Sequence, residues 1–566
     1  MYWNSFSGVF LFDDLGTIVR NTEIRQLTHL GQVLLPPADT ALAGRPLVQL
    51  SFAINYALGG LDVWGYHLVN LAFHVGCTCL IYALIRRVAP QGLAFAVALL
   101  WTVHPLNSEV VNYLTQRTES MMALCLLLTL YCVARQWRVA AVVVCSLGML
   151  CKETMAMAPV AVVLYDWAAS DVVSFRALWR TRWPLYAALS ATWIVPAVML
   201  ATRGQTLSAG FATAHVSPWT YLLNQPAMIL RYLRLALWPS DLVLYYGWPR
   251  ALHFSDVWLP FIVVAALVTL SIVALAKWRP IGVAAVWVFL FLGPTSSLLP
   301  IATEVGAERR MYLPLVGVLT LGVVGLAALA RRTAPFHRDE TWSAWPAAVV
   351  AIATVAFGAT TFARNAEYAT SLGMARTVLE RWPTANAEQM VGTELVVAGR
   401  HEEAVPHLQA AVKAYPPARY FLGEALLGAG KHAEAIAELE RFTREEPSLA
   451  PVRTRLMIAK AYGSTGQMPE AIEHLKRVLV LDPNHAEAHG LIGEALTAQK
   501  NFTDAVPHYQ AYLAANPGSI TVWSKLGLAL AMTDRLPEAR TAFERALAID
   551  PSNGPAREAL KQLRAR

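Results

Sequence analysis

Apolar and polar positions follow two different patterns along this chain, and the change falls near residue 365. Before it, long apolar runs are separated by short polar or basic segments, a pattern typical of membrane-crossing helices. After it, apolar residues recur at helical spacing within polar segments, and Pro483, Pro517 and Pro551 recur every 34 residues. The pattern therefore predicts an all-α chain: a polytopic helical membrane domain followed by an α-solenoid of helical repeats.

Ten apolar segments are candidate membrane spans, and several are shorter than the ~20 residues that a straight crossing needs. They cover approximately residues 66–87, 92–104, 119–134, 138–151, 153–168, 184–202, 256–276, 281–298, 312–330 and 345–362. We expect some neighbouring segments to merge or tilt. The segment 220–238 is also apolar, but it carries Arg231 and Arg234, so it is interpreted as an interfacial or re-entrant helix.

Basic clusters lie in alternate loops between these segments. The clusters are Arg86 and Arg87, Arg135 and Arg138, Arg176 to Arg182, Lys277 and Arg279, and Arg331 to Arg338. The positive-inside rule makes that side cytoplasmic. The other side then receives residues 1–65, 104–118, 151–153, 203–255 and 299–311, together with everything after residue 363. Residues 1–12 are apolar but too short to span, so we expect that a first transmembrane helix is missing upstream.

Composition supports a membrane chain. Of the 566 residues 56% are hydrophobic and 15% are charged, and the mean hydropathy is +0.41, which no ordinary soluble chain of this length has. The net charge of +7 comes largely from loop arginines that membrane topology explains, so we expect no nucleic-acid partner. All six cysteines lie within or at the end of apolar segments, which indicates packing residues rather than disulfides or a metal site.

The C-terminal segment matches the tetratricopeptide repeat in register. The clearest repeat contains Trp523, Leu526, Gly527, Leu530, Ala539, Phe543, Ala546 and Pro551. Five such units are enough to bury a continuous core and to curve around a concave surface that recruits a protein acceptor or a partner protein. Tyr420, Glu424 and Glu494 occupy first-helix positions that are candidates to line this groove, although a solvated helix face is the simpler interpretation.

Four regions are expected. They are a first extracytoplasmic segment over 1–65, the membrane domain over 66–363, a linker over 364–384 and the repeat domain over 385–566.

Five ordered motifs resemble one known family. They are FLFDDLGTIVRN (10–21), RPLVQLSFAINYALGGLDVWGYHLVNLAFH (45–74), HPLNSEVVNYLTQRTES (104–120), CKETMAMAPVAVVLYD (151–166) and GPTSSLLPIATEVGAERRMYLP (293–314). They resemble the transmembrane and tetratricopeptide-repeat O-mannosyltransferases and their bacterial relatives, which belong to the GT-C glycosyltransferases. The resemblance implies transfer of a sugar, mannose in relatives, from a polyprenyl-phosphate donor to protein Ser or Thr. It implies no further cofactor, and metal dependence stays open.

The resemblance also implies roles for polar residues that the topology places outside. The adjacent Asp13 and Asp14 match the acidic pair from which such enzymes take their base, without a choice between them; an Asx turn is the structural alternative. Cations that could steady the departing phosphate are Lys152, Arg203, Arg309 and Arg310. Further candidates for the substrate site are His104, Glu109, Arg117, Glu119, Glu153 and Glu308.

Other functions stay open. A glycan ligase or polymerase that uses lipid-linked sugars would share this chemistry, and a membrane-anchored repeat scaffold would need none of it. An anchor, however, needs one span and no concentration of charge on one side. No metal-ligand spacing and no nucleotide-binding glycine motif occur in the sequence. The Ala- and Arg-rich composition favours a bacterial inner membrane, with the active site and the repeats in the periplasm.

Overall fold

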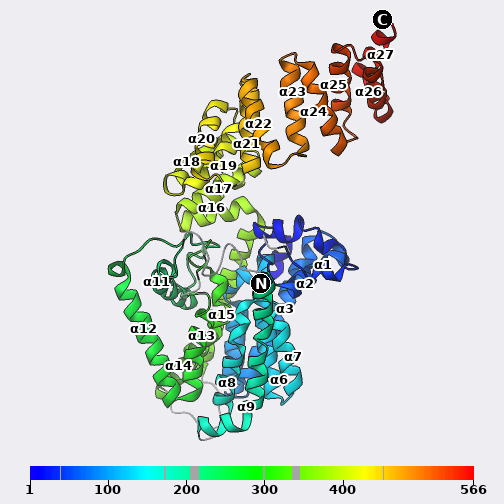
Figure 1. The fold of residues 1–566 in the computed structure, drawn as a ribbon. Coiled ribbons are helices and arrows are strands. Elements are labelled where there is room, and N and C mark those ends of the chain that lie inside the picture. The colour runs from blue at the N-terminus through cyan, green and yellow to red at the C-terminus, as the bar shows by residue number, and fades with distance from the viewer. Residues whose placement is uncertain are drawn as a thin grey trace. The chain divides into compact units, whose positions relative to one another are not determined.

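The computed structural model divides into two compact units, residues 1–383 and 384–566 (Figure 1). It describes residues 1–37, 40–170, 174–203, 216–296, 300–301, 303–333, 344–449 and 451–565. Within these residues every regular element is a helix, and no β-strand occurs. The predicted fold class, an all-α membrane domain followed by a helical solenoid, is confirmed.

Long apolar helices form the body of the first unit, which we call the membrane unit. They are α3 (Val63–Ile85), α4 (Gln91–Val103), α6 (Arg117–Ala134), α7 (Arg138–Met149), α8 (Ala158–Ala169), α9 (Phe175–Ala191), α10 (Ile194–Arg203), α12 (Phe254–Lys277), α13 (Arg279–Leu292), α14 (Pro314–Thr333) and α15 (Ala344–Ala366). The most apolar window of α6 is 67% buried and that of α12 only 6%, so α6 lies inside the bundle and α12 at its edge. An apolar helix surface without protein contacts is suited to contact with lipid.

The number of spans differs from the ten predicted segments. Five of the described helices are long and apolar enough to cross a membrane, and six if α4 and the following Pro105–Asn112 form one span that bends by 53°. Several predicted spans form shorter helices, such as α7 and α13, and the segment 184–202 is divided between α9 and α10. Apolar composition alone could not locate these breaks, because turns at Thr192 and Trp193 interrupt an otherwise apolar run.

Shorter elements complete the membrane unit. They are α1 (Leu30–Val33), α2 (Pro46–Gly59), α5 (Ser108–Asn112), α11 (Pro218–Leu237) and α16 (Ser371–Arg381), together with 3₁₀ turns that include Leu114–Gln116, Glu153–Met157 and Glu308–Met311. Residues 364–384, expected as a linker, contain the end of α15 and all of α16, and residues 364–383 belong to this unit. The Arg381 guanidinium donates to the Leu242 carbonyl at 2.8 Å and binds Glu367 at 2.7 Å.

The second unit, the repeat unit, consists of five helix pairs and a closing helix. The pairs are α17 (Ala385–Val397) with α18 (His401–Ala414), α19 (Arg419–Gly428) with α20 (His432–Glu445), α21 (Pro451–Ser464) with α22 (Met468–Leu481), α23 (Ala486–Ala498) with α24 (Phe502–Ala515) and α25 (Ile520–Met532) with α26 (Leu536–Ile549), followed by α27 (Gly554–Ala565). The prolines after α22, α24 and α26 end each pair, because the residue before a proline disfavours the helical conformation.

Small residues let the two helices of a repeat pack closely. A Cβ atom at Gly423 would lie 2.3 Å from Leu439, and one at Gly527 would lie 2.8 Å from Phe543. The turns between paired helices place one residue at positive φ: Gly399, Gly430, Gly466, Lys500 and Asp534. Glycine reaches this conformation without the steric cost that a Cβ imposes. The repeat signature in the sequence therefore corresponds to real packing constraints.

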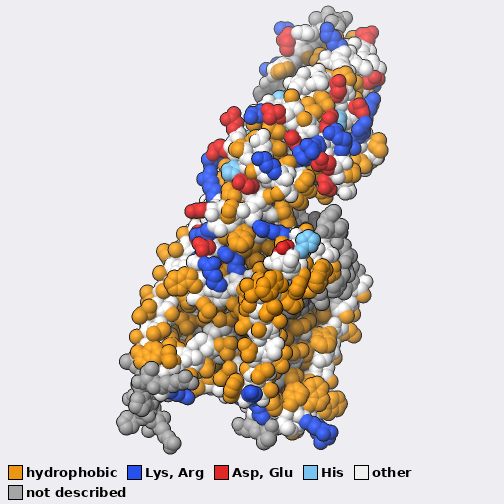
Figure 2. Space-filling view, turned by 90° about the vertical axis from the view of Figure 1, so that its left-hand side faces the viewer, with side chains coloured by type: hydrophobic (Ala, Val, Ile, Leu, Met, Phe, Trp, Pro, Cys, Tyr) orange, Lys and Arg blue, Asp and Glu red, His pale blue; other side chains and the backbone are white. Residues whose placement is uncertain are grey.

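The surfaces of the two units differ in chemistry. Figure 2 shows mostly hydrophobic side chains over the membrane unit and interspersed basic and acidic side chains over the repeat unit. Exposed apolar side chains of α12 include Leu259, Ile262 and Leu270, with exposed fractions of 56%, 54% and 62%. These residues form an apolar exterior that suits a hydrocarbon environment.

Candidate active site

The acidic pair of the first segment contains one buried and one exposed carboxyl group. Asp14 is fully buried, and its Oδ1 accepts hydrogen bonds from the Thr115 backbone N–H at 2.7 Å and from the Thr115 hydroxyl at 2.5 Å. Its Oδ2 accepts from the Leu11 N–H at 3.0 Å. Burial raises the pKa of Asp14 to about 7, the Thr115 and Leu11 hydrogen bonds oppose this rise, and the Asp13 charge adds to it. Asp14 thus fixes the N-terminal segment against the loop after α5.

Asp13 is exposed, and Tyr113 holds its backbone in place. The Asp13 N–H donates to the Tyr113 hydroxyl at 3.0 Å, and the Tyr113 N–H donates to the Glu109 carbonyl at 2.9 Å. Burial, followed by the negative charges of Asp13 and Asp14, raises the pKa of the Tyr113 hydroxyl well above its usual range. Tyr113 therefore keeps its proton. Of the two aspartates, Asp13 is the one whose carboxylate an external acceptor could reach.

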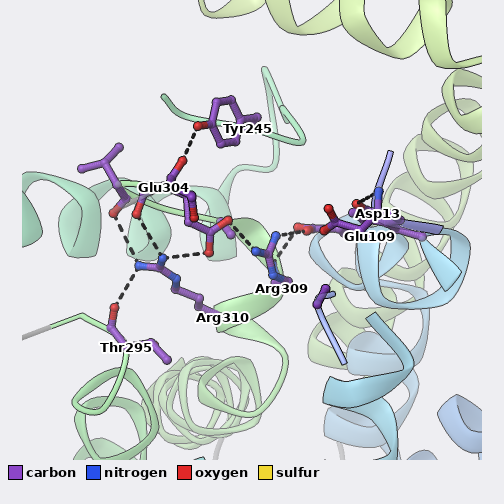
Figure 3. A network of polar contacts seen from close by, with 12 residues as sticks. Asp13, Glu109, Tyr245, Thr295, Glu304, Arg309 and Arg310 are labelled. Atoms are coloured by element: carbon purple, nitrogen blue, oxygen red, sulfur yellow. Dashed lines mark hydrogen bonds and ion pairs between the residues drawn. The ribbon is translucent and has the colours of Figure 1, made fainter. Parts of the chain in front are cut away.

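Arg309, in the motif over residues 293–314, contacts Glu109 of the predicted external loop 104–118 (Figure 3). Its Nη1 donates to Glu109 Oε1 at 2.6 Å, and its backbone N–H donates to Glu109 Oε2 at 2.9 Å. Its Nη2 binds Glu304 Oε2 at 2.5 Å. Glu109 is fully buried. Burial acts to lower the pKa of Arg309, but the negative charges of Glu304 and Glu109 outweigh it and hold this pKa well above its usual range. Two carboxylates thus fix the guanidinium: that of Glu109, 200 positions away in the sequence, and that of Glu304, 5 positions away.

Arg310 turns away from Glu109 and lies among oxygen acceptors. Its Nη2 binds Glu304 Oε1 at 3.0 Å, and its Nη1 contacts the Thr295 carbonyl at 2.9 Å and the Tyr221 hydroxyl at 3.0 Å. The Tyr221 hydroxyl in turn donates to the Thr295 carbonyl at 2.7 Å. One carboxylate, that of Glu304, therefore bridges both arginines, as Figure 3 shows.

Glu308 faces a different neighbourhood from the two arginines that follow it. It is fully buried, and its Oε1 accepts from the Val243 N–H at 2.6 Å and from the Tyr246 hydroxyl at 2.9 Å. Burial raises its pKa to about 7, the Arg364 charge lowers it, and the Glu109 charge raises it further. Glu308 thus fixes the segment 243–246 and makes no described contact with the guanidinium groups beside it.

Lys152 and Glu153 pair with different partners. Lys152 Nζ forms an ion pair with Glu119 on α6, and both side chains are nearly buried. Glu153 pairs instead with Arg45 at 2.8 Å and is 63% exposed. The adjacent charges in the sequence therefore do not neutralise each other. Lys152 faces the interior while Glu153 faces outward.

Two cavities lie between helices of the membrane unit, and the first adjoins this charged cluster. The first is small and lined by Glu119, Thr154, Thr295, Arg309 and Arg310, together with the apolar Met122, Phe291, Leu313 and Pro314. The second is apolar and lies between α3, α4, α6, α8, α13 and α14, with Leu127, Trp287, Val316 and Gly317 among its lining. Successive turns of α6, α13 and α14 line the small polar cavity and then the apolar one. The charged cavity and the apolar cavity therefore share three of their lining helices.

Two predicted candidates lie elsewhere. His104 is buried, with Nε2 on the Ala236 carbonyl at 3.1 Å and Nδ1 accepting from the Leu106 N–H at 3.2 Å, an arrangement that joins loops. Arg117 is buried among neutral acceptors, including Asn70 at 2.7 Å and Asn55 at 2.6 Å, and ties α6 to α2 and α3. The side chain of Arg203, at the end of α10, lies outside the described part.

The predicted groove residues of the repeat unit already have partners. Glu424 binds Arg453 of the next repeat at 3.0 Å, and Glu494 binds Lys525 at 2.5 Å. Tyr420 is mostly buried beneath the Arg453 guanidinium, which lies 5.6 Å from its ring centroid. These contacts join successive repeats. Binding of an acceptor by these three residues stays a prediction.

Sequence reasoning missed Glu304, Tyr113 and Thr115. Glu304 lies within the GPTSSLLPIATEVGAERRMYLP motif, five residues before Arg309, and its proximity to the arginines was the available signal. Tyr113 and Thr115 lie within the HPLNSEVVNYLTQRTES motif, where nothing in their spacing indicates contact with the first segment. In the described part of the chain no group of three or more His, Cys, Asp or Glu side chains could hold a metal ion.

The site and fold define a class of helical membrane protein with a charged site beside an apolar cavity and a tetratricopeptide-repeat unit. Residues 43–200 match the profile of the dolichyl-phosphate-mannose-protein mannosyltransferases. Residues 391–450, 456–520 and 496–563 match tetratricopeptide-repeat profiles. The apolar helices and the mannosyltransferase match make this chain an integral membrane protein.

The chain is homologous to the TMTC O-mannosyltransferases, with 25–33% identity. It is 26% identical over 295 residues to the protein O-mannosyl-transferase Tmtc1 of Drosophila melanogaster, which is 46% of this chain and 34% of that protein. It is 25% identical over 509 residues to Tmtc3 of the same species, covering 73% of this chain and 54% of that protein. The match thus spans about a third of the length of Tmtc1 and about half of the length of Tmtc3.

Among solved structures, the repeat unit resembles the crystal structure of the MamA protein. The identity is 20%, the match covers 30% of this chain and 92% of that chain, and the TM-score is 0.28.

Proposed function

We propose that this protein is a membrane glycosyltransferase that moves a sugar from a polyprenyl-phosphate donor to a hydroxyl group of an extracytoplasmic acceptor. The family match and homology support mannose as the sugar and protein Ser or Thr as the acceptor. The observation that carries the proposal is that neighbouring turns of the same helices, α6, α13 and α14, line the small Arg309–Arg310 cavity and the apolar cavity. A lipid phosphate needs both environments side by side, since its head is charged and its chain is not.

Each group in the site has a place in the transfer. The Asp13 carboxylate takes the proton of the acceptor hydroxyl as that oxygen bonds to the anomeric carbon of the sugar. The bond between the anomeric carbon and the phosphate oxygen breaks, and polyprenyl phosphate leaves with the electron pair. Arg309, Arg310 and Lys152 stabilise this leaving phosphate. Asp14 is a positioning residue that holds the segment carrying Asp13.

The proposal also includes the side of the membrane on which transfer takes place. Positive-inside topology favours a site and repeat unit on the extracytoplasmic side, in the periplasm if the chain is bacterial. The repeat unit would recruit the acceptor, since stacked helix pairs form an extended concave surface. In this proposal the protein is a GT-C glycosyltransferase, and its donor is a lipid-phosphate-linked sugar.

The experiment measures transfer of radiolabelled mannose from a polyprenyl-phosphate donor in membranes containing the full chain, with restored upstream sequence if a first helix precedes it. Asp13→Asn should lower the transfer rate by roughly 10²–10⁴-fold, the usual contribution of a general base. Glu380→Gln, at an exposed position on α16, is the matched control and should keep the wild-type rate. Transfer that survives Asp13→Asn would refute the assigned base, and a wild-type protein without transfer from any lipid-phosphate sugar would favour the scaffold alternative.

A further inference from the structure

Glu304 occupies a position that a phosphate would also suit. Its two carboxylate oxygens bind two successive guanidinium groups, Oε2 at 2.5 Å from Arg309 and Oε1 at 3.0 Å from Arg310. Its side chain is 13% exposed and lies beside the small cavity that both arginines line. In proteins, a pair of arginines binds a phosphate in the same way as it binds a carboxylate, with the anion bridging the two guanidinium groups.

The charges around this cavity already balance. The acids Glu109, Glu119 and Glu304 form ion pairs with the cations Arg309, Arg310 and Lys152. Three negative and three positive groups leave no net charge for an entering anion. A phosphodiester donor adds one negative charge, and a phosphomonoester product carries about −1.5 to −2 near pH 7. Adding either to a closed, largely desolvated and neutral set is unfavourable unless one carboxylate leaves.

Of the three acids, Glu304 is the one placed to leave. Glu109 is fully buried on α5 and also accepts the backbone N–H of Arg309, so its departure would undo the turn that carries both arginines. Glu119 lies on α6 inside the bundle. Glu304 belongs to an irregular segment, and its neighbours are held independently: Val305 N–H donates to the Gly247 carbonyl at 2.8 Å, and the Thr303 carbonyl accepts from the Tyr245 hydroxyl. Its side chain can therefore rotate away while the backbone stays in place.

We propose that Glu304 is an exchangeable counter-ion of the donor site. Its carboxylate holds Arg309 and Arg310 in the empty site, gives way to the phosphate of the polyprenyl-phosphate sugar, and returns after transfer to displace polyprenyl phosphate. This inference rests on the proposed function and adds a role in product release. Burial acts to raise the pKa of Glu304, but the charges and hydrogen bonds of Arg309 and Arg310 outweigh it and lower this pKa to about 2, so the carboxylate stays charged at neutral pH and the exchange is of one anion for another.

The test measures binding of a polyprenyl monophosphate to the purified full chain in detergent micelles. Glu304→Gln removes the competing charge and should lower the Kd for this lipid by roughly tenfold. It should also lower the KM for the donor and reduce kcat by slowing product release. Glu109→Gln should weaken binding of the same lipid, because it removes the carboxylate that orients Arg309. Glu380→Gln should leave the Kd unchanged.

The outcomes separate this inference from the proposed function. Wild-type binding and transfer, combined with equal or weaker binding by Glu304→Gln, would overturn the exchange and leave the transferase intact. If neither the wild type nor Glu304→Gln bound the lipid phosphate, the donor class and the exchange would both be wrong. Glu304→Asp retains the charge and should return the Kd towards the wild-type value. Its thermal midpoint and that of Glu304→Gln, measured without lipid, show whether each variant is folded.

Discussion

The two units use charge in opposite ways. In the membrane unit the ionic contacts include pairs of residues far apart in the sequence, such as Glu109 and Arg309, and Glu109 is fully buried. In the repeat unit they join neighbouring turns or successive repeats, as in Arg535–Glu538 and Glu424–Arg453, and the side chains are partly exposed. Because desolvation makes a buried charge depend on its partner, the first arrangement specifies one geometry, whereas the second tolerates change.

The largest effect should follow from breaking the buried arrangement. Arg309→Ala would leave the Glu109 carboxylate buried without its ionic partner, so we expect the free energy of unfolding to fall by about 3–5 kcal/mol. Arg453→Ala, in the partly exposed pair of the repeat unit, should lower it by about 0–1 kcal/mol. Thermal unfolding of the detergent-solubilised chain, followed separately for each unit by hydrogen exchange, measures both. Equal losses from the two substitutions would contradict the contrast between the units.

A smaller effect should follow from filling a gap between paired helices of the repeat unit. Gly527→Ala places a Cβ 2.8 Å from the Phe543 ring, and overpacking of this kind costs about 1–3 kcal/mol. Gly518→Ala is the matched control, since a Cβ at Gly518 would meet no atom within 4 Å. Hydrogen exchange of α25 and α26 should rise in the first variant and stay unchanged in the second. Unchanged exchange in Gly527→Ala would mean that this contact does not limit packing.

The sequence predicted the repeat unit more fully than the membrane unit, for a physical reason. Repeat packing is local: Gly527 meets Phe543 within one helix pair, so a fixed spacing carries the information. The break between α9 and α10 depends on two turn residues within an apolar run, and apolar composition does not register it. The repeat signature thus predicted five units, whereas apolar length overestimated the number of long spans.

The site was predictable as a set of residues but not as a set of contacts. Loop topology placed Asp13, Glu109, Lys152 and Arg309 on one side of the membrane. The structure brings Glu109, Lys152 and Arg309 into one charged cluster around the small cavity. Hydrogen bonds through Tyr113 link Asp13 to Glu109. Which charged side chains form ion pairs depends on the direction of the backbone at each residue, and the spacing of residues in the sequence does not encode that direction. Lys152 has an extended backbone and pairs with Glu119 rather than with the adjacent Glu153. The position of Glu304 five residues before Arg309 indicated proximity, but it did not predict that one carboxylate bridges both arginines.

The smallest predicted effect concerns pH and the repeat unit. The imidazoles of His489 and His508 meet with their Nδ1 atoms 3.0 Å apart, and His489 Nε2 lies 3.0 Å from the Pro483 carbonyl. His489 Nε2 therefore donates to that carbonyl, and one hydrogen lies between the two Nδ1 atoms, an arrangement that two charged rings could not form. Burial, followed by the positive charges of His489 and Lys476, lowers the pKa of His508, and Asp504 opposes them.

A histidine whose folded pKa is lowered binds protons more readily when unfolded. The stability of the α23–α24 pair should therefore be complete above the unfolded pKa of about 6.5 and fall as the pH drops below it. Hydrogen exchange of the full chain at pH 7.5 and 5.0, corrected for intrinsic rates, should show faster opening of α23 and α24 at the lower pH. The α25–α26 pair has no histidine in its sequence and serves as an internal control. His508→Gln should reduce the difference between the two pH values, because it removes the proton-binding group. If α23–α24 and α25–α26 lost protection equally, the acid sensitivity would belong to the solenoid as a whole and not to the histidine pair.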